Sequence, residues 1–159
     1  ADLVGSWNVT GPFGAAVRNV HGERLRATGV MTFNQDGTCL LALNSASVPL
    51  PSVGDGLCGA QVCLPCTYTV TPARRFDVNW DDTVVDALAA AATTGLLGTL
   101  SEGATTDVEV ERSAGILRPA LDRIRIETAI KGVTTIPMRE ATRRFAIRFS
   151  LGGERAPAN

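Results

Sequence analysis

Four cysteines are the residues of this 159-residue chain whose types and spacing most directly suggest chemistry: Cys39, Cys58, Cys63 and Cys66. Cys63 and Cys66 form a Cys-x-x-Cys motif, which in a thioredoxin-type redox protein opens a helix after a strand. Here residues 67–71 follow, and their Thr-Tyr-Thr-Val-Thr sequence is typical of a strand, which argues against redox catalysis. Zinc would need Cys39 as its fourth ligand, without the second Cys-x-x-Cys or histidine pair of ordinary structural sites. An even cysteine count instead favours structural disulfides formed in an oxidising compartment.

Three disulfide connectivities are open, and each contains one local bridge and one bridge from Cys39. The bridge from Cys39 ties the loop that follows its strand back to that strand, which contributes on the order of 3 kcal/mol by the loop-closure argument. In a simple hairpin Cys39 lies nearer Thr71 than Cys66. We therefore expect Cys39 to pair with Cys58 or Cys63.

Candidates for general acid–base catalysis are few. His21, the single histidine, lies with Gly22 at a predicted hairpin tip, where an exposed imidazole needs no catalytic role. Asp77, Asp81 and Asp82 could supply a carboxylate pair, but Asp81 and Asp82 are also suited to capping a helix. The sequence holds no Gly-x-Ser-x-Gly elbow, phosphate loop or dinucleotide fingerprint. We therefore predict no catalytic residue, metal or cofactor, and an enzyme is the less favoured interpretation.

Composition restricts the class of protein. With 45% hydrophobic and 19% charged residues, the chain can bury one core and is too short for two comfortable domains, so we expect one domain over residues 1–159. A formal net charge of −1 argues against a surface for nucleic acid or an anionic membrane. No run of about 18 apolar residues is present, so no transmembrane segment is expected. The composition specifies no oligomeric state.

Alternation of apolar and polar residues is the strongest structural signal. After a first strand over residues 4–10, it predicts half-buried antiparallel strands over residues 24–33, 38–43, 67–71, 75–80, 107–111, 123–127 and 142–151. Residues 114–121 contain Pro119 and are interpreted as a connection between two strands. The polar faces carry acidic and then basic stripes, which favour cross-strand ion pairs on a solvated wall over an arginine-lined anion site.

One segment departs from the strand pattern. Asp81, Asp82 and Thr83 precede an alanine-rich run over residues 84–92, which is a good start for a helix with acidic capping residues. The apolar face of this helix is narrow and made of small side chains, and its polar side carries no basic residue. We therefore expect one short helix that flanks or plugs a barrel and does not bind a membrane surface.

Gly5-x-Trp7 opens the first strand, and a strand–turn–strand unit follows around residues 30–38. This combination resembles the lipocalin-like, or calycin, β-barrels, a fold found in many small secreted bacterial proteins. The resemblance implies an all-β antiparallel up-and-down β-barrel. We expect this barrel to be closed by pairing of the strand at residues 4–10 with the strand at 142–151, because closure removes the exposed edge of the first strand.

The resemblance also implies a partner for the first tryptophan. In lipocalin-like barrels an arginine from the final strand region commonly packs over that tryptophan at the closed end. The inward phase of Phe149 continues to Arg155, so we expect Arg155 over Trp7, a cation–π contact worth about 0.5–2 kcal/mol. Arg148 is the second choice, although alternation points its side chain outward.

Three functions fit these expectations. The favoured one is a binding protein for a small apolar molecule held in the barrel, and the inward ligand-binding candidates, on strands flanking the small residues Ala27 and Gly29, are Phe33, Tyr68, Phe76 and Trp80. The alternatives are a barrel-type isomerase or cyclase, and an envelope scaffold domain with a filled core. The chain starts at Ala1 without methionine, which together with the cysteines favours a processed, secreted or periplasmic protein, with a lipid anchor before Ala1 as a variant of that interpretation.

Overall fold

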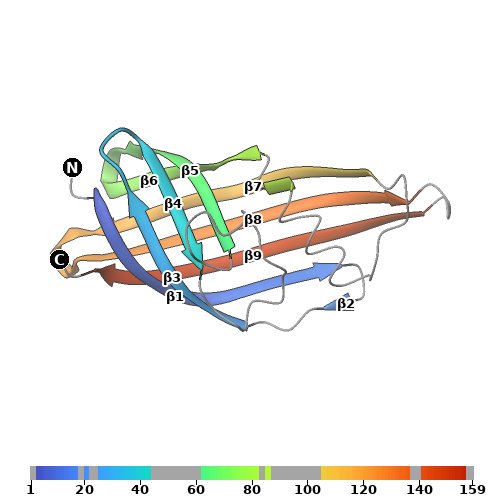
Figure 1. Ribbon diagram of the computed structural model, residues 1–159, viewed down its shortest axis with the longest axis horizontal. Helices are drawn as coiled ribbons and strands as arrows, with labels where there is room; N and C mark the ends of the chain where they lie inside the picture. Colours follow the sequence, from blue (N-terminus) through green and yellow to red (C-terminus); the bar gives the residue numbers. More distant parts are fainter. Residues whose placement is uncertain are drawn as a thin grey trace.

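A computed structural model of the protein describes residues 3–17, 20–21, 25–43, 62–82, 85–86, 105–136 and 141–156. The strands in these ranges form one antiparallel sheet in the order β2-β1-β3-β4-β5-β6-β7-β8-β9 (Figure 1). Their bounds are β1 Gly5–Val17, β2 Val20–His21, β3 Leu25–Phe33, β4 Thr38–Leu43, β5 Val62–Thr71, β6 Arg75–Trp80, β7 Thr105–Arg118, β8 Arg123–Ile136 and β9 Ala141–Arg155. This confirms the predicted all-β, up-and-down architecture.

Pairing between β1 and β9 closes the sheet into an eight-stranded barrel, to which β2 adds two residues at the end of β1. The seam runs from Trp7 opposite Arg155 to Val17 opposite Phe145. Both strands are longer than the alternation pattern indicated. The predicted barrel closure is confirmed, and the seam removes the free edges that β1 and β9 would otherwise expose.

The inner face of the barrel forms the core. Along β6, the side chains of Phe76, Val78 and Trp80 are buried while the residues between them are exposed, so the period-two pattern directly sets which face is inside. The same alternation runs along β4, where Leu41 and Leu43 are fully buried. Buried hydrophobic residues from each of the eight strands join in one cluster.

Strand β7 differs from the prediction because it continues to Arg118, through the segment interpreted as a connection. A β-bulge between Val110 and Arg112 shifts its register against β8. Before the bulge the even-numbered Val108 packs on the core, whereas after it the odd-numbered Leu117 is buried. The extra residue therefore exchanges the two faces of the strand, which breaks the alternation on which the prediction depended.

Strand β5 also starts earlier than predicted, at Val62, so the Cys-x-x-Cys motif lies within it. This changes the pairing: Cys39 of β4 lies opposite Cys66, and the two form a disulfide with their Cα atoms 4.8 Å apart. The expected pairing of Cys39 with Cys58 or Cys63 is therefore wrong. Cys63 is also disulfide-bonded, and Cys58 lies outside the described residues.

A helical conformation follows β6, as expected. Residues 82 and 85–86 are helical, and the Val85 backbone N–H donates to the Asp81 carbonyl oxygen at 2.9 Å. The rest of the predicted helix lies outside the described residues. In the part of the chain that is described, no helix has the length and apolar character needed to cross a membrane.

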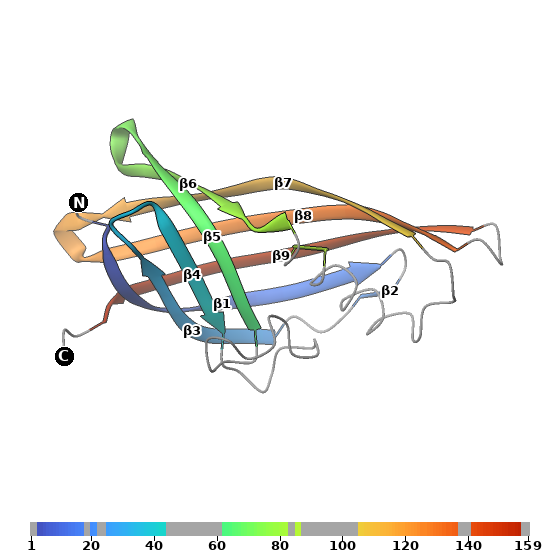
Figure 2. The same cartoon turned by 45° about the horizontal axis from the view of Figure 1, so that its top comes forward.

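The two ends of the barrel differ. At one end lie the short connections at residues 34–37, 72–74 and 119–122 together with the start of β1 and the end of β9, and we call this the sealed end (Figure 1). Toward the other end, the four long strands β7, β8, β9 and β1 extend beyond the shorter β3 to β6 (Figure 2). Pairing of β6 with β7 covers only residues 75–77 of β6. Toward the far end, the sheet therefore consists of the four long strands β7, β8, β9 and β1.

Ion pairs across neighbouring strands cover the outer wall, as the charge stripes predicted. Lys131 of β8 lies 3.8 Å from Glu109 and 3.7 Å from Glu111 of β7. Arg123 of β8 lies 3.0 Å from Glu154 of β9. All of these side chains are more than a third exposed, so each pair contributes at most about 1 kcal/mol and acts mainly on register.

Candidate functional site

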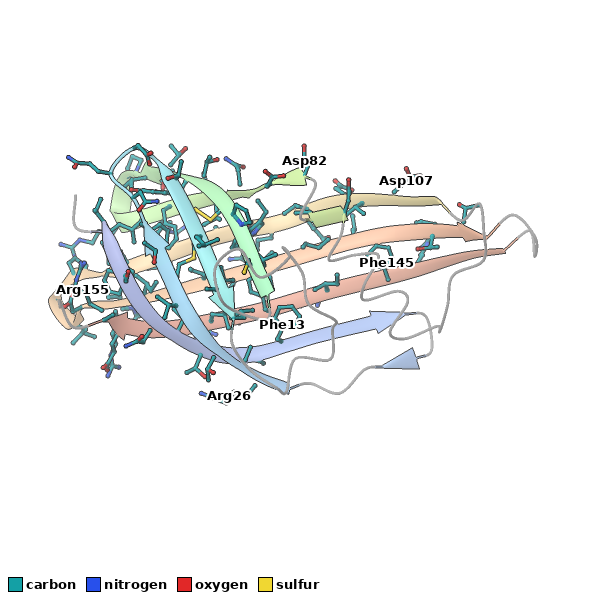
Figure 3. All side chains as sticks on the ribbon, viewed as in Figure 1. Phe13, Arg26, Asp82, Asp107, Phe145 and Arg155 are labelled. Atoms are coloured by element: carbon teal, nitrogen blue, oxygen red, sulfur yellow. A yellow bond between two sulfur atoms is a disulfide. The ribbon has the colours of Figure 1, made fainter. Side chains whose placement is uncertain are left out.

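Arg155 and Trp7 close the sealed end from the two strands of the seam. The guanidinium carbon of Arg155 lies 4.2 Å from the centroid of the Trp7 ring, which confirms the predicted contact (Figure 3 labels Arg155). Its Nη1 donates to the Val4 carbonyl oxygen and its Nε to Asp122 Oδ1, both at 2.9 Å. The buried Trp7 Nε1 donates to the Leu3 carbonyl oxygen at 3.0 Å. The Trp7 indole N–H and the Arg155 guanidinium thus both have hydrogen-bond partners, and together they form a structural plug at this end.

Three of the four predicted ligand-binding residues form a cluster next to the sealed end. The Phe33 ring packs edge-on against Tyr68 and Phe76, with centroid distances of 5.0 and 5.3 Å. The Phe76 ring covers the backbone of Gly115 on the neighbouring strand, where a Cβ would collide with it. The Tyr68 hydroxyl donates to the Asn34 carbonyl oxygen at 2.6 Å. Phe33 thus contacts both other rings and Tyr68 contacts the β3–β4 turn, and we call these three rings the floor of the barrel.

The β3–β4 turn is held by its own side chains. Asp36 Oδ1 accepts hydrogen bonds from the Thr38 hydroxyl at 2.6 Å and from the Thr38 backbone N–H at 3.0 Å. These two bonds hold the pKa of Asp36 below its usual value, because they favour the carboxylate. Burial, followed by the nearby charge of Asp36, raises the pKa of Tyr68. Both pKa shifts belong to residues at the β3–β4 turn. They therefore identify no proton-transfer group inside the barrel.

The fourth predicted residue, Trp80, belongs to a different cluster. Its ring packs against the ring of Phe149 in β9, with a centroid distance of 5.8 Å and an interplanar angle of 66°. Phe149 in turn stacks on its register partner Phe13 of β1, at 5.2 Å and 3° (Figure 3 labels Phe13). We call Trp80, Phe149 and Phe13 the Trp80 cluster. The sequence interpretation included neither phenylalanine, although the inward phase of Phe149 was visible in the alternation of its strand.

Polar atoms lie beside this cluster. Thr128 is the register partner of Phe149, it is 3% exposed, and its Oγ1 lies 3.3 Å from Ser113 Oγ on the next strand. Trp80 is 7% exposed, and among the described residues its Nε1 is the one buried side-chain nitrogen or oxygen without a hydrogen-bond partner. An indole N–H can only donate. The Trp80 cluster therefore combines aromatic surface with an unused donor.

The disulfide forms the neighbouring wall. Cys66 is the register partner of Trp80, and Cys39 is the register partner of Phe33. Both half-cystines are buried on the inner face and belong to the hydrophobic cluster. The disulfide therefore links the floor, through Phe33, to the Trp80 cluster, and it fixes β4 and β5 where they form the wall between them.

A concave region lies outside the barrel near the sealed end. It is an open groove of about 770 Å³, and its lining includes Asn8, Thr10, Arg118, Arg123, Arg125 and Arg155. Three of these arginines have carboxylate partners: Arg123 with Glu154, Arg125 with Glu127, and Arg155 with Asp122. Most of the positive charge is thus neutralised on the wall itself, which agrees with the solvated-wall interpretation.

The residues considered for catalysis do not come together at the barrel interior. His21 lies in β2 opposite Ala16 and not at the predicted hairpin tip, and its side chain is outside what the structure describes. Asp77, Asp81 and Asp82 are exposed. Within the described ranges, no three histidine, cysteine, aspartate or glutamate side chains gather in a way that could hold a metal ion.

In comparisons with known proteins, neither a protein-family model nor a curated protein matches the sequence. The likeness to lipocalin-like barrels therefore consists of the closed antiparallel barrel, the Gly5-x-Trp7 opening and the contact of Arg155 with Trp7. The fold is compatible with that group.

Proposed function

We propose that this protein is a secreted or periplasmic binding protein that holds a small apolar molecule inside its β-barrel, against the Trp80 cluster. The observation that carries the proposal is the buried Nε1–H of Trp80. A buried donor without a partner costs about 1–3 kcal/mol, and native proteins leave few of them. A ligand that accepts a hydrogen bond from Trp80 Nε1–H would remove this free-energy cost in the complex.

The surroundings of Trp80 support a mainly apolar ligand. Small-molecule sites are concave and lined by aromatic and aliphatic side chains, with a few polar groups that fix orientation. Phe13 and Phe149 supply aromatic surface, the disulfide supplies a soft apolar wall, and Thr128 and Ser113 supply two hydroxyls. The plug at the sealed end leaves the far end, where the long strands extend, as the side of entry.

Two alternatives are less well supported. A barrel isomerase or cyclase that uses acid–base chemistry would need a titratable group inside, and the buried polar residues among those described are Thr128 and Thr134. A scaffold domain with a filled core would leave no reason for an unpartnered donor beside Phe149. The disulfides support the oxidising compartment in which a secreted or periplasmic protein folds.

Titration with N-phenyl-1-naphthylamine, an apolar dye whose fluorescence rises in apolar surroundings, tests the proposal. We expect saturable binding at one site and competition by other small apolar molecules. Thr128→Leu adds bulk beside Phe149 and is expected to weaken binding about tenfold, equivalent to about 1.4 kcal/mol. The matched control is Thr69→Leu, which makes the same change at an exposed position of β5. A folded wild-type protein that binds no dye would favour the filled scaffold.

A further inference from the structure

We infer that the ligand of this barrel is a neutral molecule with a hydrogen-bond acceptor, such as a ketone, ester or amide carbonyl, that accepts from Nε1–H of Trp80. This inference rests on the function proposed above and adds to it the chemical class of the ligand. Three observations carry it: the contrast between the two tryptophans, the fixed position of the Trp80 ring, and the lack of buried charge among the described residues.

The two tryptophans of the chain show how the fold treats an indole N–H. Trp7 is fully buried, and its Nε1 donates to the Leu3 carbonyl oxygen at 3.0 Å. Trp80 is buried to nearly the same degree, and its Nε1 has no partner among the described residues. The described part of the fold thus supplies a backbone acceptor for one buried indole and none for the other. Because an indole only donates, the missing partner is an acceptor.

Neighbouring groups hold Trp80 in this arrangement. Its ring lies against Phe149, which is itself stacked on Phe13. The nearby hydroxyls of Ser113 and Thr128 lie 3.3 Å apart and contact each other. Trp80 lies at the last position of β6, opposite Cys66 of the disulfide. The donor is therefore positioned in advance, which reduces the entropic cost of binding an acceptor.

The charge of the interior limits the kind of acceptor. Every lysine or arginine side chain with a described burial is at least partly exposed, and the buried polar residues are threonines. A carboxylate or phosphate would lose its hydration without gaining a counter-charge, which is strongly unfavourable. A neutral carbonyl loses less and gains one hydrogen bond, while its apolar body contacts Phe149 and Phe13. The recognised group is therefore a neutral acceptor on an apolar, preferably flat, body.

A matched pair of probes tests this inference: 2-acetylnaphthalene, which carries a carbonyl, and 2-ethylnaphthalene, which has nearly the same shape without one. Affinities are measured by competition with N-phenyl-1-naphthylamine. For the wild type we expect the ketone to bind about three- to tenfold more tightly than the hydrocarbon, the range of one net hydrogen bond. In Trp80→Phe this preference should disappear while the hydrocarbon still binds. In Trp7→Phe, which removes the other indole, the preference should remain.

Indole ¹⁵N–¹H spectra of the wild-type protein provide a second measurement, with the spectrum of Trp7→Phe identifying which resonance belongs to Trp80. The chain has two tryptophans, so two indole resonances are expected. We expect the ketone to move the Trp80 indole proton downfield, the hydrocarbon to cause no such change, and Trp7 to be unaffected by either probe. If both probes bind equally and neither shifts Trp80 selectively, the acceptor inference is wrong while the proposed function stands. If neither probe binds to folded protein, the proposed function fails and the inference falls with it.

Discussion

Arg155 lies over the face of Trp7 and donates to the carbonyl oxygen of Val4, a residue 151 positions away in the sequence. One side chain thus joins the last described strand to the segment that precedes the first. A Cβ at Gly5, whose φ is +128°, would approach Arg155 Nη1 at 2.9 Å, so the glycine lets the chain pass beneath the guanidinium. The contact is specific to this geometry.

Replacement of Arg155 by methionine tests the contribution of this contact. We expect the free energy of unfolding to fall by about 1–4 kcal/mol, because a cation–π contact of about 0.5–2 kcal/mol is lost together with the hydrogen bonds to Val4 and Asp122. Urea unfolding measures the change. The control is Arg123→Met, which removes an exposed ion pair with Glu154 and should cost less than about 1 kcal/mol. Equal losses in the two variants would show that the plug adds nothing beyond a surface pair.

The pKa of Tyr68 gives a pH-dependence that one absorbance measurement can follow, since Tyr68 is the single tyrosine of the chain. Burial, then the charge of Asp36, raises its pKa above the usual 10.0, so the folded protein keeps the phenol proton at pH values where the unfolded chain has lost it. This contribution to stability is complete below about pH 10 and decreases as pH rises through the folded pKa. Phenolate absorbance should therefore give a midpoint above 10 in folded protein and near 10 in urea. Equal midpoints would contradict the described burial.

Two adjacent glycines of β9 should respond differently to the same substitution. A Cβ at Gly153 would collide with the backbone of Asn8 across the seam, whereas a Cβ at Gly152 would lie 3.6 Å from the Ile124 carbonyl oxygen, an ordinary contact. We expect Gly153→Ala to destabilise the protein by more than about 2 kcal/mol, within the range of overpacking. Gly152→Ala should be neutral or stabilising by up to about 1 kcal/mol, because it restricts the unfolded chain. Thermal unfolding of the two variants measures their stabilities. If Gly152→Ala were the less stable variant, the strands of the seam would have to pair in a different register.

The Cys39–Cys66 disulfide has a sequence separation of 27 residues and lies in the core. Removal of this disulfide in the double variant Cys39→Ala/Cys66→Ala is expected to lower the free energy of unfolding by about 2–4 kcal/mol. Mass spectrometry of a non-reducing digest should recover a peptide that links the two residues, and thiol titration of denatured protein should find no free thiol. A peptide that links Cys39 to Cys63 would overturn the described pairing.

The strand pattern was predictable wherever two faces of the sheet differ in solvent exposure. Alternation located β3, β4 and β6 almost to the residue, because burial of every second side chain is the dominant constraint on a half-wet strand. It failed at the β-bulge of β7, where one extra residue exchanges the faces. It also failed in β5, where Pro65 is exposed in the strand and the cysteines suggested a loop. That error moved the expected partner of Cys39.

The candidate site was predictable only in part, because it is assembled from strands distant in the sequence. Trp80 could be assigned to the interior from its alternation with Asp77 and Asn79. Its contact with Phe149 depends on the curvature and registers of the whole barrel, which no local pattern contains. The floor formed by Phe33, Tyr68 and Phe76 was indistinguishable in sequence from a ligand site, since buried aromatics look alike until their contacts are known.

The seam between β1 and β9 has a consequence for folding kinetics. Every other strand pairing of the barrel joins strands that are consecutive or nearly so along the chain. The seam instead pairs Trp7 with Arg155, which lie near opposite ends of the described sequence. Such pairings carry the largest loop-closure entropy, so hairpins should form first and ring closure should come late. Until then β1 and β9 are unpaired edges of an open sheet, which attract other chains. The yield of refolded protein should therefore fall as protein concentration rises. The rate at which β1 pairs with β9 should determine the fraction of chains that fold before they aggregate.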